Sequence, residues 1–265
     1  MESNYIEIKG VRIHYYQENK AANNCLFYIH GNSLSAATFE KQLNSKELCE
    51  YRMIALDLPG CGQSEKLNHY SLQKLSELLV EFILKLELKS IILVGHSLGG
   101  DLSLQILEEL GEIKGSFIFG SSPAKIPIQL SEMFLPNEAA NLAFNATLTR
   151  EEVRSLASNF SFKGKLLEQQ IASTDGNYRT GIAGSIFSQE YKDEVEIINA
   201  TEKPIAFVVG ENDPLINKEF LKTISFKSLY KNKLMIIKGG SHSPQIDNLE
   251  AFNNLLQAFA QSVFK

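Results

Sequence analysis

The sequence predicts an α/β protein in which a mostly parallel, doubly wound sheet carries an inserted helical cap. Short apolar, β-branched runs alternate with amphipathic segments, the pattern of a parallel sheet that helices cover on both faces. Residues 122–198 interrupt this alternation, because they hold helical patches and lack buried strand runs. We therefore expect a core formed by residues 1–121 and 199–265, with residues 122–198 as the cap.

The first predicted element is a β-hairpin. Two alternating runs, residues 5–8 and 11–16, flank the turn Lys9-Gly10. His14 lies on the second run, where we expect a surface position. Apolar runs predict the remaining strands at residues 25–29, 52–56, 90–94, 115–119, 204–209 and 234–237.

Amphipathic segments between these runs predict the helices. The expected core helices are residues 36–43, 71–86, 101–110 and 248–263, and the clearest cap helices are 151–159 and 166–173. Several strands end in glycine, which places loops at their carboxyl ends. Open α/β sheets bind ligands at that edge, so we expect the functional residues there.

Composition narrows the class of protein further. The 265 residues include 44% hydrophobic and 22% charged residues, typical of a soluble globular protein. The net charge of −5, without a dense Lys/Arg patch, argues against a nucleic-acid partner. No apolar run reaches the roughly 20 residues needed to cross a bilayer. The three cysteines contain no C-x-x-C pair, which favours reduced thiols. The N-terminus does not resemble a secretion signal, so we expect a cytoplasmic location.

The segment Gly95-His96-Ser97-Leu98-Gly99 predicts a nucleophilic serine. It follows an apolar strand and precedes an amphipathic helix, so Ser97 stands at the apex of a tight turn. Glycines two residues to either side remove Cβ atoms that would clash in such a turn. The helix directs its first amide groups and its positive dipole end toward the serine.

A serine nucleophile needs a general base, and His242 is the best candidate of five histidines. It follows the last predicted strand in a glycine-rich loop, which allows its imidazole to reach over the sheet edge. His96 adjoins Ser97, but adjacent side chains diverge in such a turn. We therefore expect His96 to fill the space beneath the strand–turn–helix elbow that residues 95–99 form.

The acid that orients the base is expected to be Asp213. It follows the strand at 204–209, and Pro214 stiffens the turn that holds it. Glu211, two residues earlier, is the alternative. The order Ser97, Asp213, His242 is one in which such triads occur along α/β chains.

The oxyanion hole requires two backbone N–H donors. The elbow supplies one, the amide of Leu98. The loop after the strand at 25–29 reads His30-Gly31-Asn32, and Gly31 lets the chain turn inward so that Asn32 offers the second. In the cap, apolar side chains are expected to bind the substrate: Met133, Phe134, Phe144, Phe160 and Phe187. Phe162 belongs to the same apolar set.

Together these motifs resemble the α/β-hydrolase superfamily over essentially the whole chain. The matching positions are His30-Gly31-Asn32, the segment 57–64, the Ser97 elbow, Asp213 and His242. The resemblance implies the α/β-hydrolase fold and a Ser-Asp-His triad. It leaves the substrate open, because esterases, lactonases, lipases and C–C hydrolases share this fold.

A narrower resemblance is to α/β-hydrolase-type N-acyl-homoserine lactonases. It rests on residues 30–35, Asp57-Leu58-Pro59-Gly60, the cap segment 173–177 and the segment 239–244. This resemblance implies that the serine attacks a lactone ring while a cap pocket takes the acyl chain. Two positions depart from the lactonase pattern: His96 stands where a bulky aromatic is expected, and Leu156 where a substrate-holding tyrosine is expected.

We therefore expect a serine hydrolase that cleaves a small, partly apolar ester or lactone through an acyl-enzyme. No metal or other cofactor is implied, and the oligomeric state stays open. A metal-dependent lactonase would need clustered histidines, whereas the five histidines of this chain are scattered. Dehalogenases and epoxide hydrolases place aspartate at the elbow, where this chain has Ser97. The remaining alternatives are a general carboxylesterase and a non-catalytic ligand receptor that keeps this fold.

Overall fold

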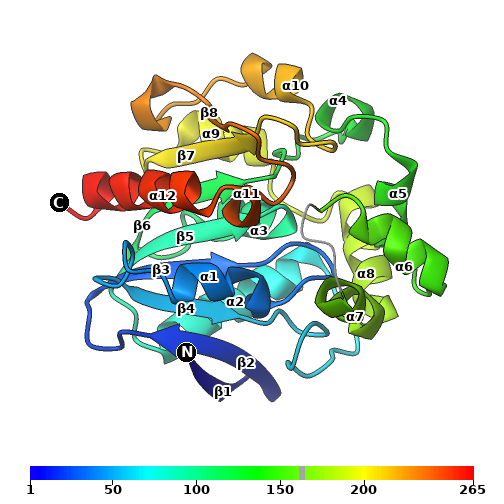
Figure 1. Cartoon of the computed structure of the whole chain (residues 1–265), viewed down its shortest axis with the longest axis horizontal. Coiled ribbons are helices and arrows are strands. Elements are labelled where there is room, and N and C mark those ends of the chain that lie inside the picture. Colours follow the sequence, from blue (N-terminus) through cyan, green and yellow to red (C-terminus); the bar gives the residue numbers. More distant parts are fainter. Residues whose placement is uncertain (161–164) are drawn as a thin grey trace.

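A computed structural model describes residues 1–160 and 165–265 of the chain. Its centre is an eight-stranded sheet of order β1-β2-β4-β3-β5-β6-β7-β8 (Figure 1). The strands are β1 (Glu2–Ile8), β2 (Val11–Glu18), β3 (Asn24–Ile29), β4 (Arg52–Leu56), β5 (Ser90–His96), β6 (Ile113–Phe119), β7 (Ile205–Gly210) and β8 (Met235–Ile237). All eight strands contain the residues expected from the sequence, with differences of a few residues at the ends.

Strands β3 to β8 run parallel to one another. The hairpin β1–β2 is antiparallel, and β2 joins the sheet antiparallel to β4. Because the parallel strands share one direction, β3, β5, β7 and β8 all end at the same edge of the sheet. The loops that hold Asn32, Ser97, Asp213 and His242 follow these four strands directly. The predicted mostly parallel, doubly wound sheet is confirmed.

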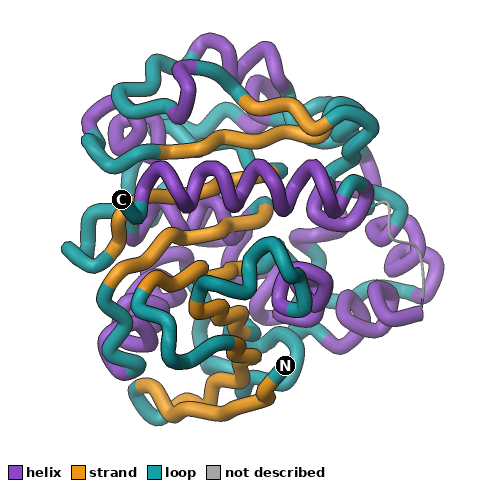
Figure 2. Tube along the Cα trace, turned by 60° about the vertical axis from the view of Figure 1, so that its left-hand side comes forward, coloured by secondary structure: helices purple, strands orange, loops and turns teal. Residues whose placement is uncertain are grey.

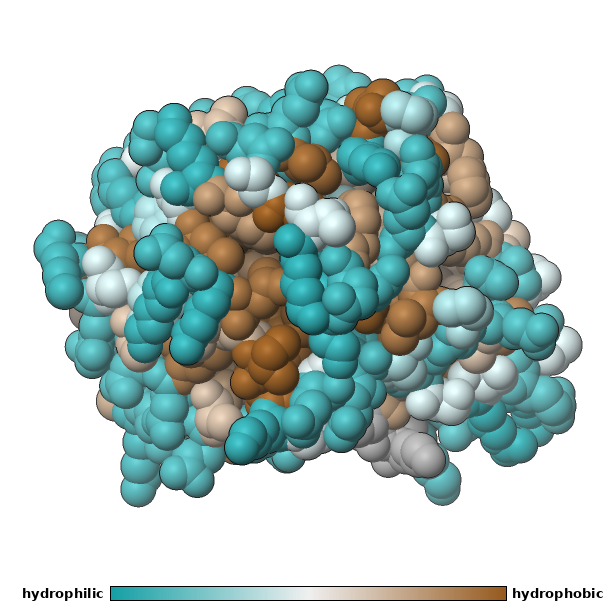
Figure 3. All heavy atoms as spheres, turned by 90° about the horizontal axis from the view of Figure 1, so that it is seen from above, coloured by the Kyte–Doolittle hydropathy of each residue, from teal (hydrophilic) through white to brown (hydrophobic). Residues whose placement is uncertain are grey.

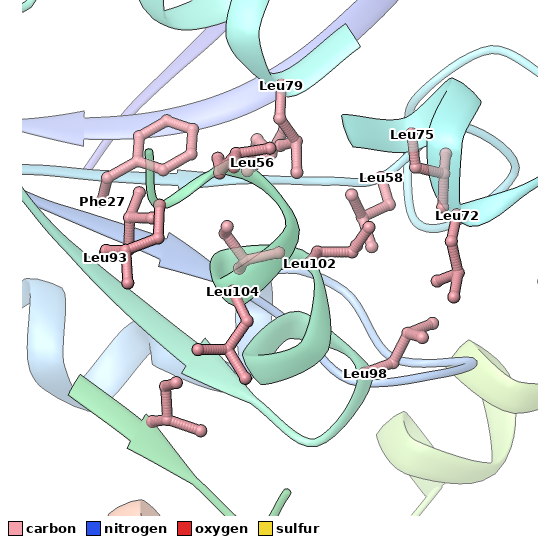
Figure 4. Close-up of a cluster of buried hydrophobic side chains, with 14 of the residues drawn as sticks. Phe27, Leu56, Leu58, Leu72, Leu75, Leu79, Leu93, Leu98, Leu102 and Leu104 are labelled. Carbon is pink, nitrogen blue, oxygen red and sulfur yellow. The ribbon is translucent and has the colours of Figure 1, made fainter. Parts of the chain in front are cut away.

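Helices cover both faces of the sheet, as Figures 1 and 2 show. One face is covered by α1 (Glu40–Leu43), which follows the short 3-10 helix η1 (Ala36–Phe39), and by α12 (Leu249–Val263). These helices pack on strand residues such as Phe117. On the other face lie α2 (Leu72–Lys85), α3 (Leu98–Ile106) and α9 (Glu194–Ala200). Figure 4 shows this second core, in which leucines from α2 and α3 meet β3, β4 and β5.

The apolar spacing of α2 explains both its formation and its burial. Leu75, Leu79 and Phe82 recur at intervals of three or four residues and are buried together against the sheet. The Ser71 hydroxyl caps the helix by accepting a hydrogen bond from the Lys74 N–H at 3.0 Å.

A helical insertion separates β6 from β7 and lies beyond the carboxyl ends of the strands (Figure 1). It contains α4 (Leu130–Met133), α5 (Glu138–Asn141), η2 (Leu142–Phe144), α6 (Arg150–Ala157), α7 (Lys165–Ser173) and α8 (Gly176–Phe187). The helices expected at 151–159 and 166–173 correspond to α6 and α7. The next helix, α9, packs against α3 of the core, and the boundaries 122 and 198 stay predictions. Phe162 lies outside the described residues.

After β7 the chain forms α10 (Lys218–Thr223) and the 3-10 helix η3 (Tyr230–Asn232), and α11 (Pro244–Asp247) follows β8. Cys25, Cys49 and Cys61 are free thiols. Within the described ranges, no helix is long and apolar enough to cross a membrane.

The expected surface position of His14 is wrong. The imidazole is fully buried, and its Nδ1 lies 2.8 Å from Asp57 Oδ2. Asp57 also accepts hydrogen bonds from the backbone N–H groups of Ala36 and Gln63. The cause is the position of the hairpin, because β2 is an interior strand paired with both β1 and β4. His14 therefore braces the loop that follows β4.

Candidate active site

Ser97 occupies a strained turn between β5 and α3. Its backbone angles are φ 52° and ψ −122°, a combination that non-glycine residues rarely adopt. α3 begins at Leu98, three residues earlier than expected, so the helix amino terminus lies directly behind the serine. A Cβ on Gly95 would clash with the Gly99 carbonyl oxygen, and a Cβ on Gly99 with the Ile29 carbonyl oxygen. Both glycines are therefore required for the sharp turn.

Asp213 and His242 form a buried pair. His242 Nδ1 lies 3.0 Å from Asp213 Oδ2 and 3.2 Å from Oδ1. The carboxylate also accepts hydrogen bonds from the backbone N–H groups of Leu215 (2.8 Å) and Ile216 (3.2 Å). Burial by itself raises the pKa of the Asp213 carboxyl. His242 and the two backbone donors outweigh that effect, so the pKa lies below its usual value. Asp213 is thus held as a carboxylate beside the imidazole.

His96 connects this pair to the elbow. Its Nε2 donates a hydrogen bond to the His242 carbonyl oxygen at 2.8 Å, and its ring stacks on Phe119 with centroids 4.8 Å apart. Burial lowers the pKa of His96 to about 3, so the ring stays neutral. His96 fills the space beneath Ser97, as its sequence position indicated. Within the described chain Ser97 and His242 are not hydrogen-bonded to each other. Contacts of this kind often tighten only when substrate binds.

The loop after β3 lies against the elbow. A Cβ on Gly31 would be 3.1 Å from the Cβ of Ser97, which places this loop beside the serine. Asn32 lines the same cavity as Ser97 and Leu98, and the role of the two amides as oxyanion donors stays a prediction. The Asn32 side chain points elsewhere: its Nδ2 donates to the Ala143 carbonyl oxygen at 3.1 Å. This hydrogen bond ties the loop to the cap.

A cavity of about 530 Å³ opens beside Ser97 between α3 and the cap. Of the five predicted substrate-binding residues, Met133, Phe134 and Phe144 line it. Phe160 and Phe187 do not: Phe160 packs against the edges of the His96 and His242 rings, and Phe187 is 60% exposed. Further apolar lining comes from Ala124, Ile128, Leu130, Ile182, Ile186 and Leu215. The face that carries α4 and α10 shows hydrophobic residues gathered in a hollow that hydrophilic residues surround (Figure 3).

Three acidic residues that the sequence did not point to also line this cavity: Asp101, Glu194 and the exposed Glu138. Asp101 Oδ1 accepts a hydrogen bond from the Ser121 hydroxyl at 2.6 Å. Glu194 is fully buried and accepts hydrogen bonds from Gln105 Nε2 (2.9 Å) and the Ala124 N–H (2.8 Å). Burial raises the pKa of Asp101 to about 7. Burial and the nearby Asp101 charge raise the pKa of Glu194 well above its usual value. Only the four-residue spacing from Ser97 to Asp101 could have pointed to this position.

The cap segment 173–177 and the core loop after β4 hold each other in place. The Asp175 N–H donates to the Gly60 carbonyl oxygen at 2.8 Å, and the Tyr70 hydroxyl donates to Asp175 Oδ2 at 2.9 Å. Both segments carried the lactonase resemblance in the sequence. Leu156, where that resemblance expects a tyrosine, is buried in an apolar cluster of the cap.

Glu211, the alternative acid, lies away from the imidazole. It is exposed, and its Oε2 accepts a hydrogen bond from the Gly239 N–H at 3.0 Å. Asp213 therefore has the contact with His242 that an orienting acid needs. Within residues 1–160 and 165–265, no three His, Cys, Asp or Glu side chains gather as metal ligands would.

Comparisons with known proteins agree with this geometry. A family model described as alpha/beta hydrolase fold matches residues 24–249. Among curated proteins, the uncharacterised hydrolase YugF of Bacillus subtilis (strain 168) is 27% identical over 82% of this chain and 83% of its own length. Epoxide hydrolase 1 of Caenorhabditis elegans is 24% identical over 97% of this chain and 70% of its own length.

Among solved structures, the N-acyl homoserine lactonase AidH superposes with a TM-score of 0.94 at 25% identity. The match covers 99% of this chain and 98% of that chain, a Ser→Gly variant complexed with N-hexanoyl homoserine lactone. The predicted family and the predicted likeness to these lactonases are confirmed.

Proposed function

The chain belongs to the α/β-hydrolase fold family, and from that premise we propose that it hydrolyses the ring ester of N-acyl homoserine lactones. The observation that carries the proposal is the buried Asp213–His242 pair at the same sheet edge as Ser97, which itself lines a largely apolar cavity. The overall likeness to AidH, which was solved with N-hexanoyl homoserine lactone, supports the choice of substrate.

The proposed reaction is acyl transfer to water. His242 Nε2 removes the proton of the Ser97 hydroxyl as Oγ attacks the lactone carbonyl carbon. The amides of Leu98 and Asn32 hold the negative oxygen of the tetrahedral intermediate, and Asp213 stabilises the imidazolium. The ring C–O bond then breaks, and His242 returns the proton to the departing alkoxide. A water molecule, activated by the same imidazole, finally releases the N-acyl homoserine.

A lactone differs from an open ester in one respect that matters here. Its leaving hydroxyl stays attached to the acyl group, so the acyl-enzyme can close again to substrate. Hydrolysis must therefore outpace ring closure, which requires the new hydroxyl to leave the vicinity of Ser97. The open space of the cavity, about 530 Å³, gives the ring-opened arm room to move away.

The cavity wall also supports an acyl chain of intermediate length. Met133, Phe134 and Phe144 provide an apolar surface beyond the elbow. Each methylene buried there contributes about 0.8 kcal/mol, equivalent to roughly fourfold in kcat/KM. We therefore expect kcat/KM to rise with chain length until the cavity is full.

Epoxide opening has weaker support, although two curated relatives of Caenorhabditis elegans are named epoxide hydrolases. That reaction, in this fold, uses a carboxylate at the elbow to form an alkyl-enzyme ester, whereas position 97 is serine.

The test is a matched panel of substrates. N-acyl homoserine lactones from butanoyl to decanoyl are compared with p-nitrophenyl esters of the same acyl chains, with and without a chelator. We expect a lactone kcat/KM at or above that of the matched ester, although the p-nitrophenyl ester is intrinsically more reactive, and no effect of the chelator.

Two results would contradict the proposal. Ester hydrolysis without lactone opening would indicate a general carboxylesterase. Tight lactone binding without turnover of either class would indicate a ligand receptor.

A further inference from the structure

The catalytic cavity contains a carboxylate with a free hydrogen-bonding position. Asp101 lies in the first turn of α3, four residues after Ser97, and its N–H donates to the Ser97 carbonyl oxygen at 3.3 Å. Residues four apart share one face of a helix, so Asp101 lies about 6 Å along the cavity wall from the serine. It is partly accessible, in contrast to Glu194, and both line the cavity.

The two carboxylate groups differ in their remaining capacity. Both oxygens of Glu194 already accept hydrogen bonds, from Gln105 and from the Ala124 N–H. Asp101 receives one, from the Ser121 hydroxyl to Oδ1, and Oδ2 receives none from the described residues. A carboxylate can accept about four hydrogen bonds, so Asp101 retains acceptor positions beside Ser97 in the cavity wall.

We propose that Asp101 is a specificity-determining residue that accepts a hydrogen bond from an N–H group of the substrate, next to the scissile ester. This inference rests on the proposed function. In an N-acyl homoserine lactone, the amide N–H is attached to the carbon next to the ring carbonyl. A substrate whose carbonyl carbon lies at Ser97 Oγ therefore carries its N–H within about one helical turn of the serine.

Charge supports the same assignment. Burial and the Asp101 charge raise the pKa of Glu194 well above its usual value, whereas burial raises the pKa of Asp101 to about 7, so Asp101 is the member of the pair that ionises as the pH rises through 7. A charged acceptor forms a stronger hydrogen bond than a neutral one. A substrate without the N–H would leave this carboxylate unpaired in the filled cavity, which disfavours its binding.

The test uses two substrates that differ at one atom. The first is N-hexanoyl homoserine lactone, and the second is α-(2-oxoheptyl)-γ-butyrolactone, in which a methylene replaces the N–H. The kcat/KM ratio of the two is measured for the wild type, Asp101→Ala, Asp101→Asn and Glu109→Ala. Glu109 is an exposed carboxylate just beyond the end of α3, so its variant controls for lost negative charge.

We expect the kcat/KM ratio of the amide to the methylene substrate to fall by about tenfold or more in Asp101→Ala. Most of this change should come from a lower kcat/KM for the amide substrate. Asp101→Asn, a neutral acceptor of the same shape, should retain part of the preference, and Glu109→Ala should retain all of it. An equal loss on both substrates would assign Asp101 a structural role, and an unchanged ratio would show that it does not contact the N–H. Either result overturns the inference.

A second substrate pair separates this inference from the lactonase proposal. It consists of p-nitrophenyl N-hexanoylglycinate and p-nitrophenyl 4-oxononanoate, which carry the same N–H to methylene exchange next to an open ester. If neither lactone is opened, the proposed lactonase activity is wrong. The ratio for these two esters then decides the role of Asp101 by the same criteria.

Discussion

At the residue scale, the strained backbone of Ser97 explains why the elbow sequence permits so little change. A positive φ at a residue with a Cβ costs about 1–3 kcal/mol and persists only where the surroundings enforce it. Here the enforcement comes from hydrogen bonds. The Ser97 N–H donates to the Phe119 carbonyl oxygen at 2.9 Å, and the Ser97 carbonyl accepts from Gly100 at 2.7 Å. The strained turn holds the partly exposed Ser97 at the sheet edge, where it lines the cavity.

Asp213 is expected to contribute to turnover and Glu211 is not. Asp213→Asn should lower kcat for a p-nitrophenyl ester by about 10⁴-fold, because an amide favours the wrong imidazole tautomer. Glu211→Gln, two residues away and exposed, is the matched control and should stay within about threefold of the wild type, as surface substitutions have small effects. A larger loss in the Glu211 variant than in the Asp213 variant would exchange their roles.

The acidic pair Asp101 and Glu194 predicts how the stability of the protein changes with pH. In the unfolded chain an aspartate has a pKa near 4, whereas burial raises the pKa of Asp101 to about 7 in the folded protein. Between these values the folded state binds more protons, so its stability falls as pH rises. Asp101→Asn removes this loss and should be more stable than the wild type at pH 8, by at least about 1 kcal/mol.

The measurement is urea unfolding of both proteins at pH 5 and pH 8. The advantage of Asp101→Asn should shrink toward pH 5. A variant less stable than the wild type at pH 8 would show that the carboxylate does not carry the expected cost.

At the element scale, one arginine connects the separate helices of the cap. Arg179 on α8 is buried and donates hydrogen bonds to the carbonyl oxygens of Asn145 (2.7 Å), Ala146 (3.0 Å) and Ile171 (3.1 Å). Asn145 and Ala146 directly follow Phe144 in the cavity wall. The guanidinium therefore holds part of that wall to α7 and α8.

Arg179→Met should destabilise the cap by at least about 3 kcal/mol, because it leaves several buried carbonyls without a donor. We also expect a higher KM for long acyl chains with a smaller change for p-nitrophenyl acetate. Limited proteolysis and steady-state kinetics measure the two effects. Arg154→Met is the control, since Arg154 is an exposed residue of α6. Equal proteolysis of the two variants would remove the role assigned to Arg179.

Secondary structure was predictable from the sequence where burial imposes a simple pattern. The strands are continuous apolar runs because helices cover both faces, and α2 and α12 have regular apolar spacing. α8 was not predicted, because its buried face includes Arg179 and Ser185 as well as apolar residues. The short helices α4 and α5 were missed for a related reason: each is four residues long and depends on tertiary contacts.

At the scale of the whole molecule, the candidate triad was readable because each member lies in a short motif at the end of a strand. One parallel sheet then brings residues 97, 213 and 242 to a common edge. The cavity wall was harder to predict, because it depends on how the cap folds back over that edge. Phe144 and Phe187 lie in neighbouring cap elements, with ring centroids 6.3 Å apart, yet only Phe144 lines the cavity. Apolar composition cannot distinguish two such positions.

The most direct test of the account is the ring opening of N-hexanoyl homoserine lactone by the wild type and by Ser97→Ala, with thermal melting to verify that both are folded. We predict a loss of at least about 10⁴-fold in kcat for the variant, because without the hydroxyl no acyl-enzyme forms. A folded Ser97→Ala protein that opens the lactone within tenfold of the wild-type rate would contradict a serine mechanism at this site.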